Sequence, residues 1–368
     1  MNPPDQISCH YFLINNVPIA FRRADAESAS FLLNILEPWS SRGRTQGLDK
    51  QEWDICAWTS AEQVERLCDQ LSGVPRLPVK RWRGDDYHQM VSDAAGNVAV
   101  LHTSPFVGVT LYCGVDRRIY CVFRDGLDIP HCEHTVKYPG RTGGRREGRF
   151  DCHASCGVFG DTAIVFIGQR RCGKTTLALE AIFSGANYVS NDLCVLELGQ
   201  KEITVHALPH MLRLTDENAR RWPTIARRTF DLDRANEDYS KGFVFNGGKY
   251  EAYAPAIPEI LPSIVGNIPY PVRAVVFPSA TVHRRGCAVR ILSAEETLDR
   301  TVEQIALDRP LPDWLPAGSV LVASVSQFIN EGPTGNSSLF GIDFSFSFED
   351  RGAFKTLFDA LATLGVRI

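Results

Sequence analysis

The sequence of 368 residues lacks the features of several broad classes of protein. It has no apolar run close to the ~18 residues that cross a bilayer, and it does not begin with a basic segment followed by an apolar one, as a secretory signal does. The formal net charge of -4 gives no reason to expect binding to nucleic acid or to a membrane surface. Internal repeats and low-complexity tracts are also absent. We therefore expect a globular cytoplasmic protein.

The cysteines lack the spacing of a disulfide framework or a simple zinc site. They number 11, which is odd, and no CxxC motif occurs among them. We expect reduced thiols that act as small buried apolar residues. Two segments that combine His and Cys, HCEH at 131–134 and DCHASC at 151–156, leave a zinc site open as an alternative.

Residues 1–137 contain strand and helix patterns without a motif of known chemistry. Alternating apolar residues and turn signals predict hairpins, and helical spacing predicts two helices, the second opened by a capping box at Ser60 and Gln63. The sequence thus predicts a smaller α+β domain here. The expected strands cover 11–22, 54–58, 87–92, 98–102, 110–113 and 118–123, and the expected helices cover 26–39 and 60–71.

The next segment, 138–150, is rich in Gly and Arg and poor in apolar residues. We interpret it as a linker or mobile loop whose four arginines are solvated, with phosphate contact as the alternative.

The sequence of residues 151–368 has the pattern of an α/β domain. The continuous apolar run at 163–168 is typical of a strand buried on both faces, and a helical pattern follows it directly. Ser293 and Glu296 form a capping box that opens an amphipathic helix. Further strands are expected at 187–192, 193–198 and 272–280, and the later helix at 293–307.

The segment GQRRCGKT at 168–175 satisfies the Walker A pattern G-x-x-x-x-G-K-[ST] between that strand and that helix. Its glycines let backbone N–H groups point at phosphates, beside the positive end of the helix dipole. Lys174 is expected to contact the β- and γ-phosphates, and the Thr175 hydroxyl to bind Mg²⁺. The residues expected to bind the nucleotide are Gly168, Gln169, Arg170, Arg171, Cys172, Gly173, Lys174, Thr175 and Thr176.

Three further residues are candidates with open alternatives. Asp192 ends a predicted strand, where a carboxylate can serve as general base or Mg²⁺ ligand, or merely cap a turn. His153 precedes the P-loop, and by residue type alone a lone histidine is more often structural than functional. Cys172 lies next to phosphate-binding amides, which predicts a lowered thiol pKa, or else it fills space.

The segment from Asp151 to Asp192 resembles the catalytic core of the HPr kinase/phosphorylase superfamily. The similarity is greatest to divergent members that phosphorylate hydroxyls of peptides or small molecules. The matching features are His153, the P-loop, Gly185 and the pair Asn191-Asp192, over about 40 residues, with a weaker likeness at 272–304. The implied fold is the α/β P-loop fold shared with phosphoenolpyruvate carboxykinase, over 151–368.

The resemblance implies an ATP-dependent kinase with Mg²⁺, in which Asp192, His153 and Lys174 are catalytic and Thr175 and Asp192 bind the metal. Arg213 matches a basic residue of such kinases that meets a phosphate, with a surface ion pair as the alternative. This chain departs from the family at Asn191, where an Asp is usual, and it lacks the signature for recognising HPr. The base role therefore falls on Asp192, and HPr is not the expected acceptor.

Three functions compete at this stage. A kinase acting on a hydroxyl of a small molecule or peptide is favoured by His153, Lys174 and Asp192 together. A nucleotide-dependent ATPase or switch comes second, although neither an NKxD guanine motif nor an LSGGQ signature is present. A regulatory nucleotide-binding protein comes third. The acceptor, the choice between ATP and GTP, and homo-oligomer formation are left open.

Overall fold

The structure is a computed structural model in which strands outnumber helices, and the chain divides into two compact units. Unit 1 consists of Met1–Gly144 and Leu311–Ser319, and unit 2 of Arg145–Pro310 and Val320–Ile368. The residues that the structure describes are 8–14, 17–23, 41–42, 53–70, 72, 77–78, 88–91, 98–102, 108–113, 117–124, 148–199, 202–207, 211–230, 243–246, 248–253, 256–265, 268–281, 286–307, 339–348, 350 and 352–366.

Unit 1 contains a nine-stranded sheet in the order β3-β1-β2-β4-β9-β8-β7-β6-β5. Neighbouring strands are antiparallel except at β2–β4 and β4–β9, which are parallel. The strands are β1 (Ser8–Ile14), β2 (Val17–Arg23), β3 (Ser41–Arg42), β4 (Trp53–Thr59), β5 (Leu77–Pro78), β6 (His88–Val91), β7 (Val98–His102), β8 (Gly108–Cys113) and β9 (Arg118–Phe123).

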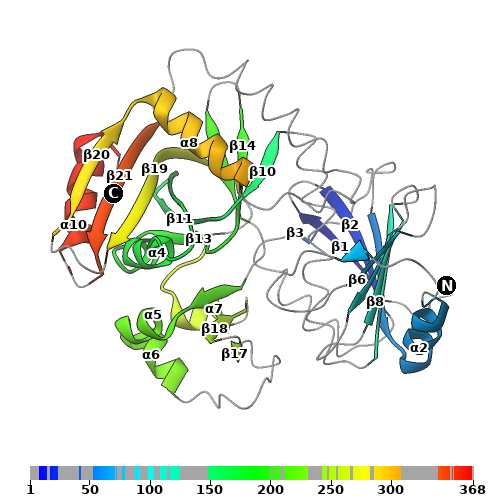
Figure 1. Cartoon of the computed structure of the whole chain (residues 1–368). Helices are drawn as coiled ribbons and strands as arrows, with labels where there is room; N and C mark the ends of the chain where they lie inside the picture. Colours follow the sequence, from blue (N-terminus) through cyan, green and yellow to red (C-terminus); the bar gives the residue numbers. More distant parts are fainter. Residues whose placement is uncertain are drawn as a thin grey trace. The chain divides into compact units, whose positions relative to one another are not determined.

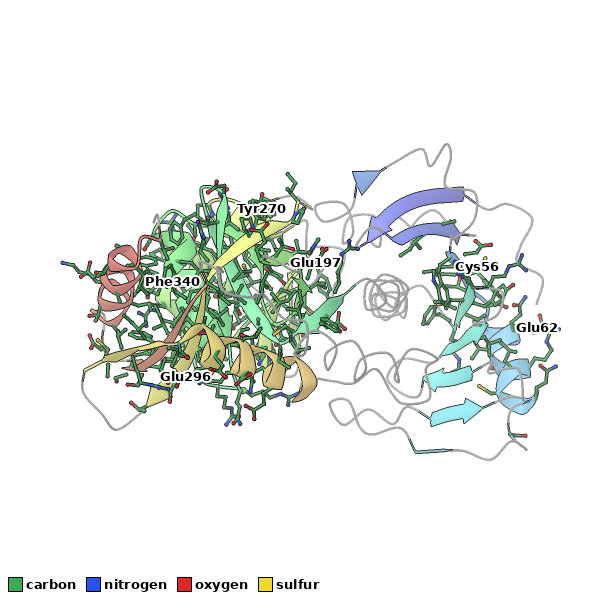
Figure 2. All side chains as sticks on the ribbon, turned by 90° about the horizontal axis from the view of Figure 1, so that it is seen from above. Cys56, Glu62, Glu197, Tyr270, Glu296 and Phe340 are labelled. Carbon is green, nitrogen blue, oxygen red and sulfur yellow. The ribbon has the colours of Figure 1, made fainter. Side chains whose placement is uncertain are left out.

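Helix α2 (Ala61–Gln70) packs on this sheet and begins where the sequence predicts. The Ser60 hydroxyl accepts the N–H of Gln63 at 3.3 Å, but the Gln63 side chain accepts from the Trp58 indole at 2.8 Å instead of closing the capping box. Cys56 and Trp58 of β4 are buried against Val64 of the helix, and Figure 2 shows Cys56 among packed side chains.

Unit 2 contains a second nine-stranded sheet, with seven strands in the order β10-β14-β15-β19-β12-β11-β13 and with β21 joining β19 to β20. The long strand β19 is parallel to β12 and β21 and antiparallel to β15. The strands are β10 (Arg149–Cys152), β11 (Ala154–Phe159), β12 (Thr162–Ile167), β13 (Asn187–Ser190), β14 (Cys194–Leu198), β15 (Ile203–His206), β19 (Tyr270–Thr281), β20 (Ala288–Leu292) and β21 (Phe340–Ser347).

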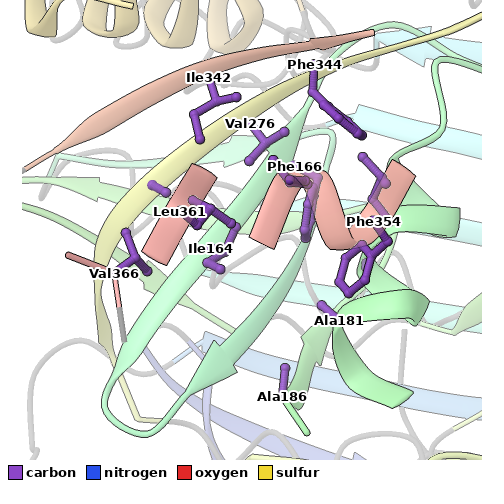
Figure 3. Close-up of a cluster of buried hydrophobic side chains, with 14 of the residues drawn as sticks. Ile164, Phe166, Ala181, Ala186, Val276, Ile342, Phe344, Phe354, Leu361 and Val366 are labelled. Atoms are coloured by element: carbon purple, nitrogen blue, oxygen red, sulfur yellow. The ribbon is translucent and has the colours of Figure 1, made fainter. Parts of the chain in front are cut away.

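Helices cover both faces of this second sheet (Figure 1). On one face, α4 (Lys174–Phe183) and α10 (Ala353–Thr363) bury a core that includes Phe166 of β12 and Ile342 of β21 (Figure 3). The neighbouring Gly341 faces the opposite side of the sheet, because successive strand residues face opposite sides. A Cβ added at Gly341 would meet Thr297 of α8 (Ala294–Leu307). β12 is thus buried on both sides, which explains its continuous apolar sequence.

A three-stranded antiparallel sheet in the order β16-β18-β17 forms a separate part of unit 2. Helix α5 follows β16 after the N-cap Thr215, whose side chain accepts the N–H of Asn218. The elements are β16 (Leu212–Leu214), α5 (Asp216–Arg221), α6 (Pro223–Phe230), β17 (Phe243–Asn246), β18 (Lys249–Ala252) and α7 (Ile257–Ile260).

Most of the predicted elements that fall on described residues are confirmed. The first predicted hairpin is confirmed by the pairing of Ile14 with Val17, and α8 has a complete capping box in which Ser293 and Glu296 each accept the other's N–H. The helix predicted at 26–39 lies outside the described residues. β10 begins at Arg149, within the predicted linker. No helix among the described residues is long and apolar enough to cross a membrane.

Candidate functional site

Sheet register brings three separate pieces of the chain to one edge of the unit 2 sheet. Ala154, the first residue of β11, pairs with Ile167, the last of β12. Cys156 of β11 pairs with Ser190, the last of β13. The residues just beyond these ends, namely His153, the Gly168 loop, Asn191 and Asp192, therefore gather at the same edge.

The loop from Gly168 to Gly173 joins β12 to α4 and is held by two backbone hydrogen bonds of Cys172. The N–H of Cys172 donates to the Gln169 carbonyl at 3.4 Å, and the Cys172 carbonyl accepts from the N–H of Ala280, beyond the middle of β19, at 3.0 Å. Gln169, Arg170 and Arg171 are exposed, so the outer part of the loop faces solvent.

Lys174 is the first residue of α4 and is 6 % exposed. Its Nζ donates to the carbonyl oxygens of Gly168 at 2.6 Å and Gln169 at 2.9 Å. A lysine ammonium can exchange such carbonyl partners for phosphate oxygens, because it is a compact charge with three donors. The ammonium is thus held over the loop by groups that a phosphate can replace.

Gly173 caps the helix with φ +103°, and a Cβ there would lie 2.5 Å from Cζ of Phe346. We expect Gly173→Ala to distort the loop and to weaken nucleotide binding at least tenfold, since both the backbone conformation and the space demand glycine. The matched control is Gly185→Ala, where φ is +112° and nothing lies within 4 Å of the added Cβ. Titration with a fluorescent ATP analogue measures both, and equal affinities for the two variants would contradict the steric argument.

His153 and Asp192 form a hydrogen-bonded pair although they lie 39 residues apart. His153 Nε2 is 2.8 Å from Asp192 Oδ1, with side chains 10 % and 20 % exposed. Asp192 has φ +78°, a left-handed conformation that Asp and Asn adopt more readily than most residues. A carboxylate in this setting has a fixed orientation and an imidazole partner that can share a proton or a charge.

Thr175 and Asn191 meet on the inner side of the site. The Thr175 hydroxyl donates to Asn191 Oδ1 at 2.9 Å, and the Ser155 hydroxyl donates to the same oxygen at 2.8 Å. The oxygen donors fit a hard cation, since Mg²⁺ in nucleotide sites takes one or two protein oxygens and obtains the rest from phosphates and water. Thr175 and the Asp192 carboxylate are the residues that would hold it.

Arg213 lies in β16 and is buried. The alternative of a surface ion pair is therefore wrong, because the ion pair that Arg213 forms is a buried one. Its guanidinium pairs with Glu251 of β18, which is also buried, and Nε has no hydrogen-bond partner among the described residues. The Arg213 carbonyl accepts from Asn191 Nδ2 at 3.2 Å, which brings β16 to the site. Phosphate contact by Arg213 stays a prediction.

The lowered pKa predicted for Cys172 is wrong. Burial raises the pKa of this thiol, and the attraction of the nearby Lys174 ammonium only partly offsets that effect. The amides of the loop do not compensate for the loss of solvent. Cys172 therefore fits the alternative of a residue that fills space in the loop.

The structure bears on two alternatives from the sequence, a zinc site and phosphate contact by the arginine-rich segment. Cys152 and Cys156 are buried, and no three His, Cys, Asp or Glu side chains within the described part of the chain cluster as a metal site would require. The HCEH segment at 131–134 lies outside the described residues. Of the four arginines at 138–150, Arg149 pairs with Glu197 at 2.9 Å, and the others lie outside the described residues.

Three residues whose side chains support the start of α4 were missed or undervalued in the sequence. Asn191 appeared only as a departure from a family pattern, and Ser155 and Asn218 were not singled out. Ser155 did carry a signal, because a hydroxyl inside an apolar strand must find a partner. Asn218, which accepts the Thr176 hydroxyl at 3.0 Å, follows from no local pattern because the two lie 42 residues apart.

No protein-family model matches the chain, and no curated protein matches it either. The resemblance of 151–192 to HPr kinase-like proteins therefore depends on the motif residues themselves, and its functional consequences are proposals.

Proposed function

We propose that this chain is an ATP-dependent kinase that transfers the γ-phosphate to a hydroxyl of a small molecule or peptide, on an α/β P-loop domain in unit 2. One observation carries the proposal. The His153–Asp192 pair, with 2.8 Å between Nε2 and Oδ1, lies at the same sheet edge as the Walker A loop that ends in Lys174 and Thr175. A carboxylate oriented by an imidazole beside the loop can take the proton of an attacking hydroxyl, which supports transfer to an acceptor.

Each residue has a distinct role in the proposed transfer. The acceptor oxygen attacks the γ-phosphorus, its proton passes to the Asp192 carboxylate, and the bond to the ADP oxygen breaks. His153, with the proton on Nε2, donates to Asp192 Oδ1 and keeps the carboxylate directed at the acceptor. Lys174 stabilises the charge on the phosphate oxygens, and the backbone N–H groups of the loop bind the β-phosphate.

Mg²⁺, when bound, neutralises charge on the β- and γ-phosphates. The Thr175 hydroxyl and Asp192 would supply protein oxygens to it. Asn191 carries no charge, so the pair Asn191-Asp192 offers a single carboxylate, and we infer that the metal would bind together with the nucleotide.

An assay of ADP release with and without candidate acceptors tests the proposed function. The proposal expects slow release alone, faster release with the true acceptor, and a product that carries one phosphoryl group by mass spectrometry. Fast release that no acceptor changes would favour the ATPase or switch. Nucleotide binding without any release would favour a regulatory binder. The cytoplasmic location expected from the sequence is part of the proposal.

Thr175→Ala tests the metal role of this hydroxyl. We expect the Mg²⁺ concentration for half-maximal activity to rise about tenfold or more, while the melting temperature changes little, because Thr175 is only partly buried. Thr175→Ser is the matched control, since it keeps the hydroxyl. An unchanged Mg²⁺ titration for the Ala variant would argue against Thr175 as a ligand.

A further inference from the structure

Asn191 connects three elements through one buried amide. It is 1 % exposed, and its Oδ1 accepts the hydroxyls of Ser155 in β11 and Thr175 in α4. Its Nδ2 donates to the carbonyl of Arg213 in β16. A side chain with this set of partners joins the P-loop helix to both sheets of unit 2.

The Arg213 carbonyl decides which way the amide points. A carbonyl only accepts, so the amide NH₂ must face it and the amide oxygen must face the two hydroxyls. Each hydroxyl must then donate its proton to Asn191. The proton of Thr175 is thereby directed away from any other acceptor, and the lone pairs of its oxygen are left for a cation.

We propose that Asn191 is a positioning residue, which orients the Thr175 hydroxyl for the Mg²⁺ of the bound nucleotide and does so as a neutral amide. The inference rests on the proposed nucleotide site. Partners behind a metal ligand fix its orientation and usually change metal affinity by about 10–100-fold when removed. A carboxylate at 191 would keep an acceptor for Thr175 but would set a second oxygen against the Arg213 carbonyl.

The chain offers a closely matched comparison at the next residue. Thr176 also donates its hydroxyl to an asparagine, Asn218 of α5, at 3.0 Å. Thr176 is buried and its hydroxyl is directed to α5, so we assign that bond to helix attachment. Removing each asparagine in turn deletes one threonine–asparagine bond of nearly equal length, but only Asn191 serves the proposed metal ligand.

The experiment is Mg²⁺ titration of ATP binding, followed with a fluorescent ATP analogue, for the full chain and the variants Asn191→Ala, Asn191→Asp and Asn218→Ala. We expect Asn191→Ala to raise the Mg²⁺ concentration for half-maximal binding about tenfold or more. Binding without metal should change less than about twofold in the same variant, as expected when only a partner behind the metal ligand is removed. Asn191→Asp keeps an acceptor for Thr175 and should stay within about threefold, although it loses the same bond to Arg213. Asn218→Ala should leave the Mg²⁺ titration unchanged.

The outcomes separate this inference from the proposed function. Equal shifts for Asn191→Ala and Asn191→Asp, or no shift for Asn191→Ala, would overturn the positioning role while wild-type binding stands. Wild-type protein without Mg²⁺-dependent ATP binding would overturn both. If Asn191→Ala does not fold, Ser155→Ala and Thr175→Ala give a second test. Ser155→Ala keeps the Asn191–Thr175 bond and should not move the Mg²⁺ titration, whereas Thr175→Ala should, and equal behaviour of the two would overturn the inference.

Discussion

Lys174→Ala is expected to abolish measurable phosphoryl transfer. The ammonium is the buried charge that the Walker A loop holds for the phosphates in the proposed site. Loss of a preorganised contact to the transition state typically lowers turnover by about 10²–10³-fold, or roughly 3–4 kcal/mol. Lys174→Arg keeps the charge but not the compact shape, because a planar guanidinium differs from an ammonium in size and donor geometry, so it should also be strongly impaired.

The fold should tolerate Lys174→Ala better than the reaction does. The substitution removes the hydrogen bonds to the carbonyls of Gly168 and Gln169 and the longer one to Cys172 Sγ, but Gln169 is exposed and water can replace the lost donor there. The expected loss of unfolding free energy is about 1 kcal/mol. Lys249→Ala removes an exposed lysine of β18 and serves as the control for loss of charge alone. Turnover of Lys174→Ala near the wild-type value would show that the P-loop interpretation is wrong.

Much of unit 2 could be predicted because its elements have strong local patterns. β12 is buried on both faces, which its continuous apolar residues indicated, and the glycine-rich loop between strand and helix marked the start of α4. Ser293 and Glu296 also indicated the start of α8 from a local pattern, because a capping box involves residues three apart. Such elements can be predicted from the sequence because the residues that determine them are neighbours along the chain.

The contacts that complete the site instead join residues that lie far apart in the sequence. Asn191 joins β11, α4 and β16, and the Arg213–Glu251 pair joins β16 to β18. Sheet register decides these contacts, and the register of strands separated by long connections cannot be read from local sequence patterns. The prediction of a lowered pKa for Cys172 was wrong for a related reason. The sequence shows amides and a lysine nearby, whereas burial of the thiol in the folded structure dominates.

Asp192→Asn is expected to separate catalysis from binding. Asn adopts the left-handed conformation of residue 192, φ +78°, as readily as Asp does, so the substitution adds no backbone strain. Its carbonyl oxygen can still accept from His153 Nε2 in place of Asp192 Oδ1. What it loses is the negative charge and the ability to take a proton. Turnover should therefore fall by roughly 10²-fold or more, the range of general acid–base assistance, with ATP affinity within a few-fold of wild type.

The measurement pairs nucleotide titration with product formation on the true acceptor, for Asp192→Asn, His153→Ala and the control Asp161→Asn. Asp161 is an exposed carboxylate in the turn between β11 and β12, so its substitution removes the same charge from the same unit without touching the site. His153→Ala should lower turnover with ATP still bound, because the carboxylate loses the partner that orients it. Normal turnover of Asp192→Asn would end the proposed mechanism. Loss of ATP binding in that variant would show that the metal role of Asp192 dominates and would leave the base unassigned, because a base that acts only on the acceptor contributes nothing to nucleotide affinity.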